Sequence, residues 1–311
     1  MNKPVDIGVI GVGHLGQHHA RILNEIEGAH LVGISDVNEE IGKAAADKYG
    51  VKFFKDFREL AKHVEAVTVV VPTFLHHDVA KYFLENNIHT FIEKPITKTL
   101  QDANDLVSIS GDKQLTLQVG HVERFNAAIV KLQSLIENPR FIECQRLCPF
   151  SNRIQDVGVV LDMMIHDIDI VLSLVKSPIK NIDAVGIPVL TNNEDIANAH
   201  IVFENGCIAN LTASRISEDK VRKLRIFEMD KYCSLDYAEQ TITMAHKSNE
   251  EHKIVCEDLD VQKAEPLRKE LEHFINCIQE KKKPLVTIED GKNALEVALE
   301  ILTKCKNSIK A

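Results

Sequence analysis

Three ionisable residues stand in two segments of this sequence with the types and spacing needed to move a proton. Lys94 lies in the segment Glu93-Lys94-Pro95, directly after an apolar run. Asp162 and His166 are four residues apart, so a helix would place both on one face. Oxidation of a secondary alcohol requires a base that reaches the hydroxyl, and a lysine or a histidine can serve. We therefore expect Lys94, Asp162 and His166 to be the catalytic residues of such an oxidation.

Each of these residues also has a structural interpretation that the sequence leaves open. A lysine after a strand is commonly a solvated surface charge. Asp162 and His166 could bond to each other or to the backbone, although their apolar neighbours make an unsatisfied pair costly. Their spacing also suits zinc. No third ligand follows at a recognisable spacing, so the sequence predicts no metal site.

A glycine-rich turn, residues 11–16, joins the apolar run of residues 5–10 to a helical stretch. This is the spacing and place of a dinucleotide-binding turn, in which the backbone approaches a pyrophosphate and the helix N-terminus meets its charge. The alternative is a tight turn without a ligand. The predicted cofactor contacts in the turn are Gly11, Gly13, His14, Leu15 and Gly16.

Further cofactor contacts are expected where later apolar runs end. Asp36 follows the second run, 20 residues after Gly16, where a carboxylate can accept hydrogen bonds from ribose hydroxyls. A 2′-phosphate would be repelled there, so NAD is favoured over NADP. Alternatively, Asp36 caps the helix that begins near Asn38. Ligands of parallel sheets bind at the carboxyl edge, where the sequence places Pro72, Thr73, Glu93, Lys94 and either His76 or His77.

The order of apolar runs predicts an α/β fold with two domains, which suits a chain of 311 residues. Between residues 5 and 120, short apolar runs alternate with helical stretches, a pattern typical of a doubly wound parallel sheet. Beyond Gly120, strand-like runs follow one another without helices, which predicts a mostly antiparallel open sheet. We expect an N-terminal Rossmann domain for NAD over residues 1–120 and a C-terminal α+β domain for the substrate over residues 121–311.

The composition argues against several classes of protein. A net charge of −9 does not suit a surface for nucleic acid or for an anionic membrane. The seven cysteines form no CxxC pair and are odd in number, which favours free thiols in a reducing compartment. No apolar segment has the length of a signal peptide or a membrane span. We expect a cytoplasmic enzyme.

With the glycine turn, Glu93-Lys94-Pro95 and the segment 162–169 in this order, the chain resembles the Gfo/Idh/MocA oxidoreductases. The resemblance covers essentially the whole length. It implies that Lys94 contacts both cofactor and substrate. It also implies that Asp162 and His166 bind the substrate, with His166 as the proton acceptor.

The same resemblance favours His76 over His77 beside the cofactor. It implies a homo-oligomer, a dimer or a tetramer, formed through the open face of the second sheet. The second domain is therefore expected to serve in oligomerisation as well as in substrate binding.

Other segments resemble the UDP-N-acetylglucosamine 3-dehydrogenases within this family. They are residues 11–21, 120–126, 156–162, 194–199 and 214–217. The resemblance implies a small-molecule nucleotide sugar as substrate, oxidised at its 3-hydroxyl with NAD, and an aminotransferase that then makes an amino sugar for lipid A. One departure is Ala127, where related sequences tend to have proline, and it bears only on the local geometry of a helix start.

A nucleotide-sugar substrate would need cations for its diphosphate. The candidates are Arg153, Arg215, Lys220, Arg222 and Arg225, with Arg124 and Asn126 as candidate sugar contacts. Each could equally be an ordinary solvated side chain.

Two other functions stay open at this stage. A dehydrogenase of a free sugar or polyol, such as an inositol, would need no diphosphate site. An NAD-sensing binding protein without turnover would be expected to lack the catalytic groups, which are present here.

Overall fold

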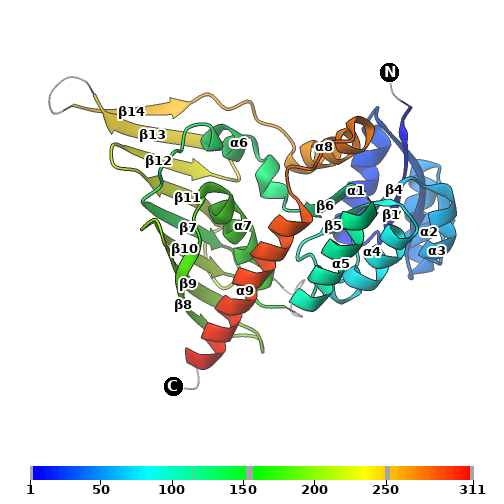
Figure 1. Cartoon of the computed structure of the whole chain (residues 1–311), viewed down its shortest axis with the longest axis horizontal. Helices are drawn as coiled ribbons and strands as arrows, with labels where there is room; N and C mark the ends of the chain where they lie inside the picture. Colours follow the sequence, from blue (N-terminus) through cyan, green and yellow to red (C-terminus); the bar gives the residue numbers. More distant parts are fainter. Residues whose placement is uncertain (1–2, 114, 152–156, 249–252, 309–311) are drawn as a thin grey trace. The chain divides into compact units, whose positions relative to one another are not determined.

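The structure, a computed structural model, describes residues 3–113, 115–151, 157–248 and 253–308 (Figure 1). These residues form two compact units. The first comprises Met1–Val122 with Glu265–Lys292, and the second comprises Glu123–Ala264 with Asn293–Ala311. The sequence predicted two continuous domains with one boundary near residue 120. In the structure, the C-terminal segment Glu265–Lys292 belongs to the first unit.

The first unit is built on a six-stranded sheet in the order β3-β2-β1-β4-β5-β6, and every neighbouring pair is parallel. The strands are β1 (Val5–Ile10), β2 (Ala29–Ser35), β3 (Lys52–Phe54), β4 (Ala66–Val69), β5 (His89–Glu93) and β6 (Leu117–Gly120). All four residues of β4 are buried, as expected for a central strand covered on both faces. The predicted doubly wound Rossmann sheet is confirmed. Its strand order reverses between β1 and β4, the position where such sheets bind ligands.

Helices and short 3₁₀ turns connect these strands. They are α1 (His14–Glu25), α2 (Glu39–Tyr49), α3 (Phe57–Leu60), η1 (Ala61–His63), η2 (Thr73–Leu75), α4 (His76–Glu85) and α5 (Leu100–Lys113). The 3₁₀ turn η3 (Val122–Phe125) follows β6 at the boundary between the units, and α8 (Pro266–Glu280) joins the first unit from the C-terminal part of the chain. Helix α1 packs against α2 and α8, and α4 packs against α5.

Helix α8 returns to the first unit because one of its faces is apolar. Leu271, Phe274 and Ile275 follow helical spacing and are buried in the same core cluster as Ile7 and Phe91. Pro266 is the first residue of the helix, a position that suits proline because the first helical N–H has no partner in the helix.

The second unit is built on an eight-stranded sheet in the order β14-β13-β12-β11-β7-β10-β9-β8. The strands are β7 (Phe141–Leu147), β8 (Ile179–Ile187), β9 (Ile196–Phe203), β10 (Ile208–Ser214), β11 (Val221–Phe227), β12 (Lys231–Asp236), β13 (Thr241–Lys247) and β14 (Ile254–Leu259). Only the β7–β10 pair is parallel among the pairs described. The prediction of a mostly antiparallel sheet is therefore confirmed.

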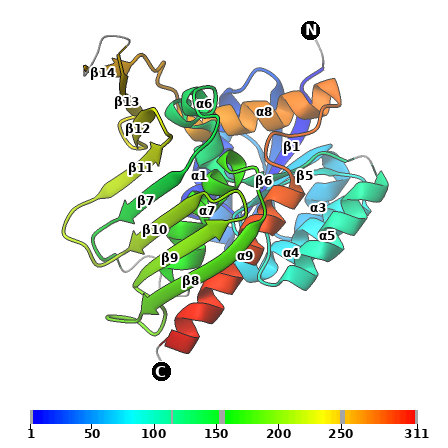
Figure 2. The ribbon, with the colours of Figure 1, turned by 60° about the vertical axis from the view of Figure 1, so that its left-hand side comes forward.

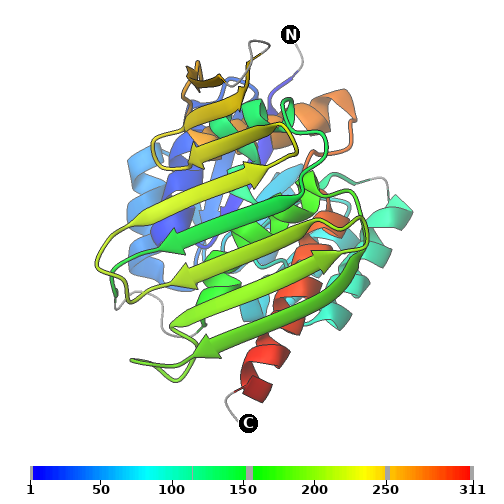
Figure 3. The ribbon, with the colours of Figure 1, turned by 90° about the vertical axis from the view of Figure 1, so that its left-hand side faces the viewer.

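One face of this sheet carries helices. They are α6 (Ala127–Gln133), the π-helical turn η4 (Val160–Met164) with its continuation α7 (Ile165–Leu174), and α9 (Ile288–Ser308). Figure 2 shows them on one side of the sheet, and Figure 3 looks onto the other side. Buried and partly exposed residues alternate along β7, β9 and β10, so the apolar side chains meet the helices.

Two general properties concern the whole described chain. None of the seven cysteines, all within the described ranges, forms a disulfide bond, as the sequence predicts. No helix in the described ranges is both long enough and apolar enough to cross a membrane.

We predict that Phe274→Ala destabilises the protein by about 3–5 kcal/mol, the usual cost of emptying a buried phenylalanine site. Phe274 is fully buried, and its ring meets the edge of the Phe91 ring at a centroid distance of 5.8 Å. Phe74→Ala is the matched control, because the Phe74 side chain is 65% exposed. Urea unfolding followed by circular dichroism measures both variants, and equal losses of stability would contradict the place of α8 in this core.

Candidate active site

The three glycines of the turn after β1 have three different environments. Gly11 has a φ of +85°, and a Cβ there would lie 2.4 Å from the Val70 carbonyl oxygen. A Cβ on Gly16 would lie 1.9 Å from the Gly11 carbonyl oxygen, so α1 packs directly on the turn. A Cβ on Gly13 would meet no atom within 4 Å. Gly11 thus forms the tight turn, Gly16 allows close packing of α1, and Gly13 leaves the backbone accessible. A dinucleotide-binding turn needs all three properties to hold a pyrophosphate.

The start of α1 is open to an anion. Gly13 is its N-cap, and within the described ranges no side chain caps it. His14 and Leu15 are exposed in the first turn. Helix N-termini carry unpaired N–H groups and a partial positive charge, so this end of α1 suits a phosphate group.

Asp36 connects the end of β2 to the glycine turn. Its Oδ2 accepts a hydrogen bond from the Val12 N–H at 2.8 Å, and its Oδ1 accepts one from the Asn38 N–H at 2.8 Å. A carboxylate oxygen can accept two bonds, which leaves capacity for ribose hydroxyls. The alternative that Asp36 caps the next helix is wrong, because Asn38 caps α2 through the N–H groups of Glu40 and Ile41.

His76 lies behind the ends of β4 and β5. Its Nδ1 is 2.8 Å from the Pro95 carbonyl oxygen and its Nε2 is 2.9 Å from the Val71 carbonyl oxygen. Burial lowers the pKa of His76, and a neutral ring donates to only one of the two carbonyls. The ring therefore donates to one of the two strand ends and lies beside the other. Pro72 and Thr73 follow directly after Val71, beside the glycine turn, and direct cofactor contacts by these residues and His76 stay predictions.

Glu93 is a buried carboxylate beneath Lys94. Its Oε1 is 3.1 Å from Nε2 of His19, and its Oε2 accepts a hydrogen bond from the Lys94 N–H at 3.1 Å. Burial alone would raise the pKa of Glu93, but the bond to His19 and the charge of Lys94 lower it below its usual value. A Cβ on Gly120, the partner of Glu93 in β6, would lie 3.0 Å from this carboxylate. Glu93 therefore stays ionised and fixes the backbone at Lys94.

Sequence reasoning did not identify His19. It is fully buried on α1, and its ring meets Phe91 edge to face at a centroid distance of 5.5 Å. A usable signal was present, because Gly16, His19 and Leu23 follow helical spacing on the buried face of α1. A histidine on such a face needs a polar partner, which here is Glu93.

In the second unit, Asp162 lies in the π-helical turn η4 and His166 in the first turn of α7. Both side chains are partly exposed, whereas Met164, Ile165 and Ile168 are fully buried. Residues four apart stay on nearly the same side of a π turn, so the sequence argument for one shared face still applies. Single π turns within α-helices are frequent at functional sites.

The residue after His166 is tied firmly to the sheet. Arg146 donates from Nε and Nη2 to the two carboxylate oxygens of Asp167, at 3.1 and 2.9 Å, and from Nη1 to Glu123 at 2.9 Å. Its guanidinium lies 4.9 Å from the ring centroid of Tyr237. All of these groups are buried, so the cluster holds α7 in one orientation.

Arg124 and Asn126, the candidate sugar contacts, are buried in the same region. Arg124 donates to Asp169 on α7 at 3.4 Å. Asn126 caps α6 by accepting a hydrogen bond from the Ala128 N–H at 3.1 Å, and its amide donates to the Tyr237 carbonyl oxygen at 3.0 Å. These contacts support the helices, and a sugar contact for either residue stays a prediction.

The candidate phosphate cations differ in how they are used. Arg215 is buried, and Arg225 pairs with Glu143 at 3.0 Å. Lys220 and Arg222 are exposed and have no ion pair among the described residues. Arg153 lies outside the described residues.

Lys220 and Arg222 share a neighbourhood with Asp162. Burial raises the pKa of the Cys148 thiol, the Asp162 carboxylate raises it further, and Arg222 and Lys220 oppose this rise. Cys148 in turn lies 4.0 Å from the sulfur of Met163. Leu147 pairs with Val221 across the ladder, so Lys220 and Arg222 lie at the end of the sheet where Cys148 meets the turn that carries Asp162.

No cluster of three or more histidine, cysteine, aspartate or glutamate side chains that could hold a metal occurs in the part of the chain that the structure describes.

Known proteins resemble this chain along nearly its whole length. Residues 5–121 match the family model described as an oxidoreductase family with an NAD-binding Rossmann fold, and residues 131–228 match the GFO/IDH/MocA C-terminal domain. The chain is 34% identical to a UDP-N-acetylglucosamine 3-dehydrogenase from Acidithiobacillus ferrooxidans, over 94% of this chain and 95% of that protein. A solved structure of such an enzyme from the same organism has a TM-score of 0.92 and covers 96% of this chain and 97% of that one, at 34% identity. A myo-inositol 2-dehydrogenase from Thermotoga maritima is 27% identical over 93% of this chain and 92% of its own.

We predict that Gly13→Ala weakens NAD binding by about tenfold or more, equivalent to about 1.4 kcal/mol, while leaving thermal stability unchanged. The new methyl group would stand in the open space above the turn, and a φ of −61° suits alanine. Gly16→Ala should instead destabilise the fold, because its Cβ would overlap the Gly11 carbonyl. Gly111→Ala is the control, since it adds a methyl group to an open position on α5. Calorimetric titration with NAD and thermal unfolding measure the variants, and unaltered NAD affinity of Gly13→Ala would contradict the prediction.

Proposed function

Because this chain belongs to the Gfo/Idh/MocA oxidoreductase family, we propose that it oxidises the 3-hydroxyl of a UDP-N-acetylhexosamine with NAD. UDP-N-acetylglucosamine is the proposed substrate and its 3-keto derivative the product. The observation that carries this proposal is the 34% identity to the Acidithiobacillus ferrooxidans enzyme over 94% of the chain, which includes the second unit as well as the Rossmann unit.

The proposed mechanism assigns one task to each residue of the site. Bound NAD accepts the hydride that leaves the alcohol carbon. His166 accepts the hydroxyl proton, and Asp162 accepts a hydrogen bond from a substrate hydroxyl. The Lys94 ammonium stabilises negative charge on the reacting oxygen as the proton leaves. Asp162 and His166 are partly exposed, whereas Met164 and Ile165 between them are fully buried. This exposure supports the proposed roles, since a ligand could not reach fully buried side chains.

We assign the diphosphate of the substrate to Lys220 and Arg222. Arg222 lies two residues before the buried Leu224 on β11, so its side chain is on the helix-covered face of the sheet. Its partner across the ladder is Arg146, which also faces the helices. Lys220 precedes β11 at the same end. Arg215 and Arg225 are less suited to this task, because each already binds a carboxylate.

We place this activity in a cytoplasmic homo-oligomer. Its keto-sugar product would be the substrate of an aminotransferase that makes an amino sugar for lipid A. The face of the eight-stranded sheet opposite the helices is the proposed subunit contact. Val185 and Ile187 of β8 support it, because they are 45% and 50% exposed on that face.

A second candidate is oxidation of a free polyol such as an inositol. The 27% identity to the Thermotoga maritima myo-inositol 2-dehydrogenase favours it. A panel of nucleotide sugars, free sugars and inositols, monitored by NADH absorbance, distinguishes the two. The proposal requires turnover of UDP-N-acetylglucosamine and a product two mass units lighter. Turnover of inositols alone would replace it with the second candidate.

His166→Ala should lower turnover by about a hundredfold or more, the usual contribution of a positioned base, and leave NAD affinity unchanged. His246→Ala is the matched control, because His246 is a partly exposed histidine on β13 of the same unit. Steady-state rates and NAD titration are the measurements. Wild-type turnover in His166→Ala would remove this residue from the role of base.

Arg222→Ala and Lys220→Ala should each raise KM for the nucleotide sugar by about tenfold, as expected for the loss of one charge-assisted hydrogen bond. Lys223→Ala is the matched control, because the next residue along β11 projects from the opposite face of the sheet. KM for NAD should stay constant in all three. If the Lys223 variant lost as much affinity as the Arg222 variant, the assignment of the diphosphate would be wrong.

A further inference from the structure

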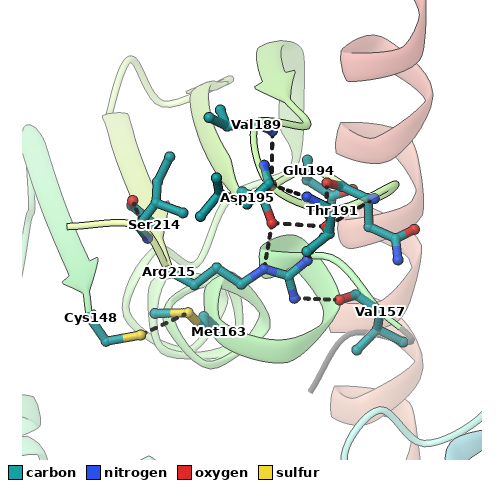
Figure 4. A network of polar contacts seen from close by, with 12 residues as sticks. Cys148, Val157, Met163, Val189, Thr191, Glu194, Asp195, Ser214 and Arg215 are labelled. Atoms are coloured by element: carbon teal, nitrogen blue, oxygen red, sulfur yellow. Dashed lines mark hydrogen bonds and ion pairs between the residues drawn. The ribbon is translucent and has the colours of Figure 1, made fainter. Parts of the chain in front are cut away.

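Two short segments that mark the sequence, residues 194–199 and 214–217, meet in the second unit without a role in the proposed chemistry (Figure 4). Asp195 directly precedes β9 and Arg215 directly follows β10. The Arg215 N–H donates to the Asp195 carbonyl oxygen at 2.9 Å, and its side-chain Nε donates to Asp195 Oδ1 at 2.7 Å. Both side chains are buried, so this is an ion pair inside the protein.

Asp195 is surrounded by donors. Its Oδ2 accepts hydrogen bonds from the N–H groups of Val189, Leu190 and Thr191 at 2.8, 2.6 and 2.9 Å. Its Oδ1 accepts the Thr191 hydroxyl at 2.9 Å in addition to Arg215. Burial alone would raise the pKa of Asp195, but the bonds from Leu190 and Arg215 hold it well below its usual value. The carboxylate is therefore charged and locks the loop after β8.

Arg215 extends this lock to the helix that carries Asp162. Its Nη1 donates to the Val157 carbonyl oxygen at 2.8 Å, and its Nη2 donates to the Thr191 hydroxyl oxygen at 2.7 Å. One planar guanidinium thus reaches the Asp195 carboxylate, a hydroxyl and a backbone carbonyl (Figure 4). A lysine has a single ammonium centre and cannot reproduce that planar fork.

Glu194, the neighbour of Asp195 in sequence, contacts the three residues that follow Val157. The Val159 N–H donates to the Glu194 carbonyl oxygen at 3.0 Å, and the Val160 N–H donates to its Oε1 at 3.2 Å. A Cβ on Gly158 would lie 1.9 Å from that Oε1, so the carboxylate rests on the glycine. The Asp162 N–H in turn donates to the Gly158 carbonyl oxygen at 3.2 Å. The backbone that enters the π turn is thus bonded from Val157 to Val160.

We propose that Arg215, Asp195, Thr191 and Glu194 are positioning residues that set the orientation of the Asp162 turn and thereby the place of the substrate. The inference rests on the proposed role of Asp162 in substrate binding. None of the four residues touches the reacting atoms in this assignment. Their effect passes through the backbone of residues 157–162.

Thr191 offers the mildest test. Thr191→Val keeps the shape of the side chain but removes the hydroxyl that joins Arg215 to Asp195, whereas Thr191→Ser keeps the hydroxyl. Thr191→Val and Arg215→Lys should each raise KM for UDP-N-acetylglucosamine by about tenfold, with KM for NAD unchanged. Thr191→Ser should stay within about twofold of the wild type. Thr243→Val is the control, because Thr243 also bonds an aspartate, Asp258, but on β13.

Hydrogen exchange gives a second readout that does not depend on turnover. Peptides that cover residues 157–164 should exchange faster in Thr191→Val and Arg215→Lys than in the wild type or Thr191→Ser. Peptides from β4 should be unaffected. Wild-type KM and wild-type exchange in both Thr191→Val and Arg215→Lys would overturn the inference.

Asp162→Asn separates this inference from the proposed function. If Asp162→Asn impairs sugar oxidation and the Thr191 and Arg215 variants do not, only the positioning role is wrong. If Asp162→Asn has wild-type kinetics, the proposed role of Asp162 fails. Faster exchange in the Thr191 and Arg215 variants would then still show that the network orders the turn, but without a consequence for the substrate.

Discussion

The bidentate pair between Arg146 and Asp167 is the interaction on which the substrate side of this protein depends. Both groups are buried, and a buried carboxylate keeps its charge only where donors replace water. Asp167 directly follows His166, so the ion pair fixes the backbone next to the proposed base. The first unit repeats this arrangement, because the buried Glu93, bonded to His19, directly precedes Lys94. In both units the charge that holds the backbone and the group proposed for chemistry are neighbours in sequence.

In this arrangement, the groups that stabilise the backbone differ from the groups proposed to react. The supporting carboxylates point into the protein and are matched there by Arg146 or His19, while Lys94 and His166 stay partly exposed. The π turn at Asp162 follows the same division, because its entry is bonded by Arg215 and its own side chain is partly exposed. Rigid support around adaptable side chains is a common requirement of sites that must orient a small polar substrate.

Features that depend on neighbours in the sequence could be predicted, and features that depend on distant partners could not. The glycine turn and the parallel strands were predictable because local spacing and apolar runs determine them. Helical spacing placed His19 on the buried face of α1, but its partner Glu93 could not be predicted, because it lies 74 residues away. For Arg215, sequence alone could not separate a solvated cation from a buried one, since only the folded loop brings Asp195 to it. The π turn was also missed, because its pattern of apolar residues is that of an ordinary helix.

The return of α8 to the first unit has a consequence for how the protein is made. Phe274 and Leu271 complete the core around β1, yet they leave the ribosome only after the strands of the second unit have been synthesised. Until α8 is synthesised, Ile7 and Phe91 lack the part of their packing that this helix supplies. An N-terminal domain usually folds before its successor emerges, but the core of this first unit is complete only once α8 has been synthesised.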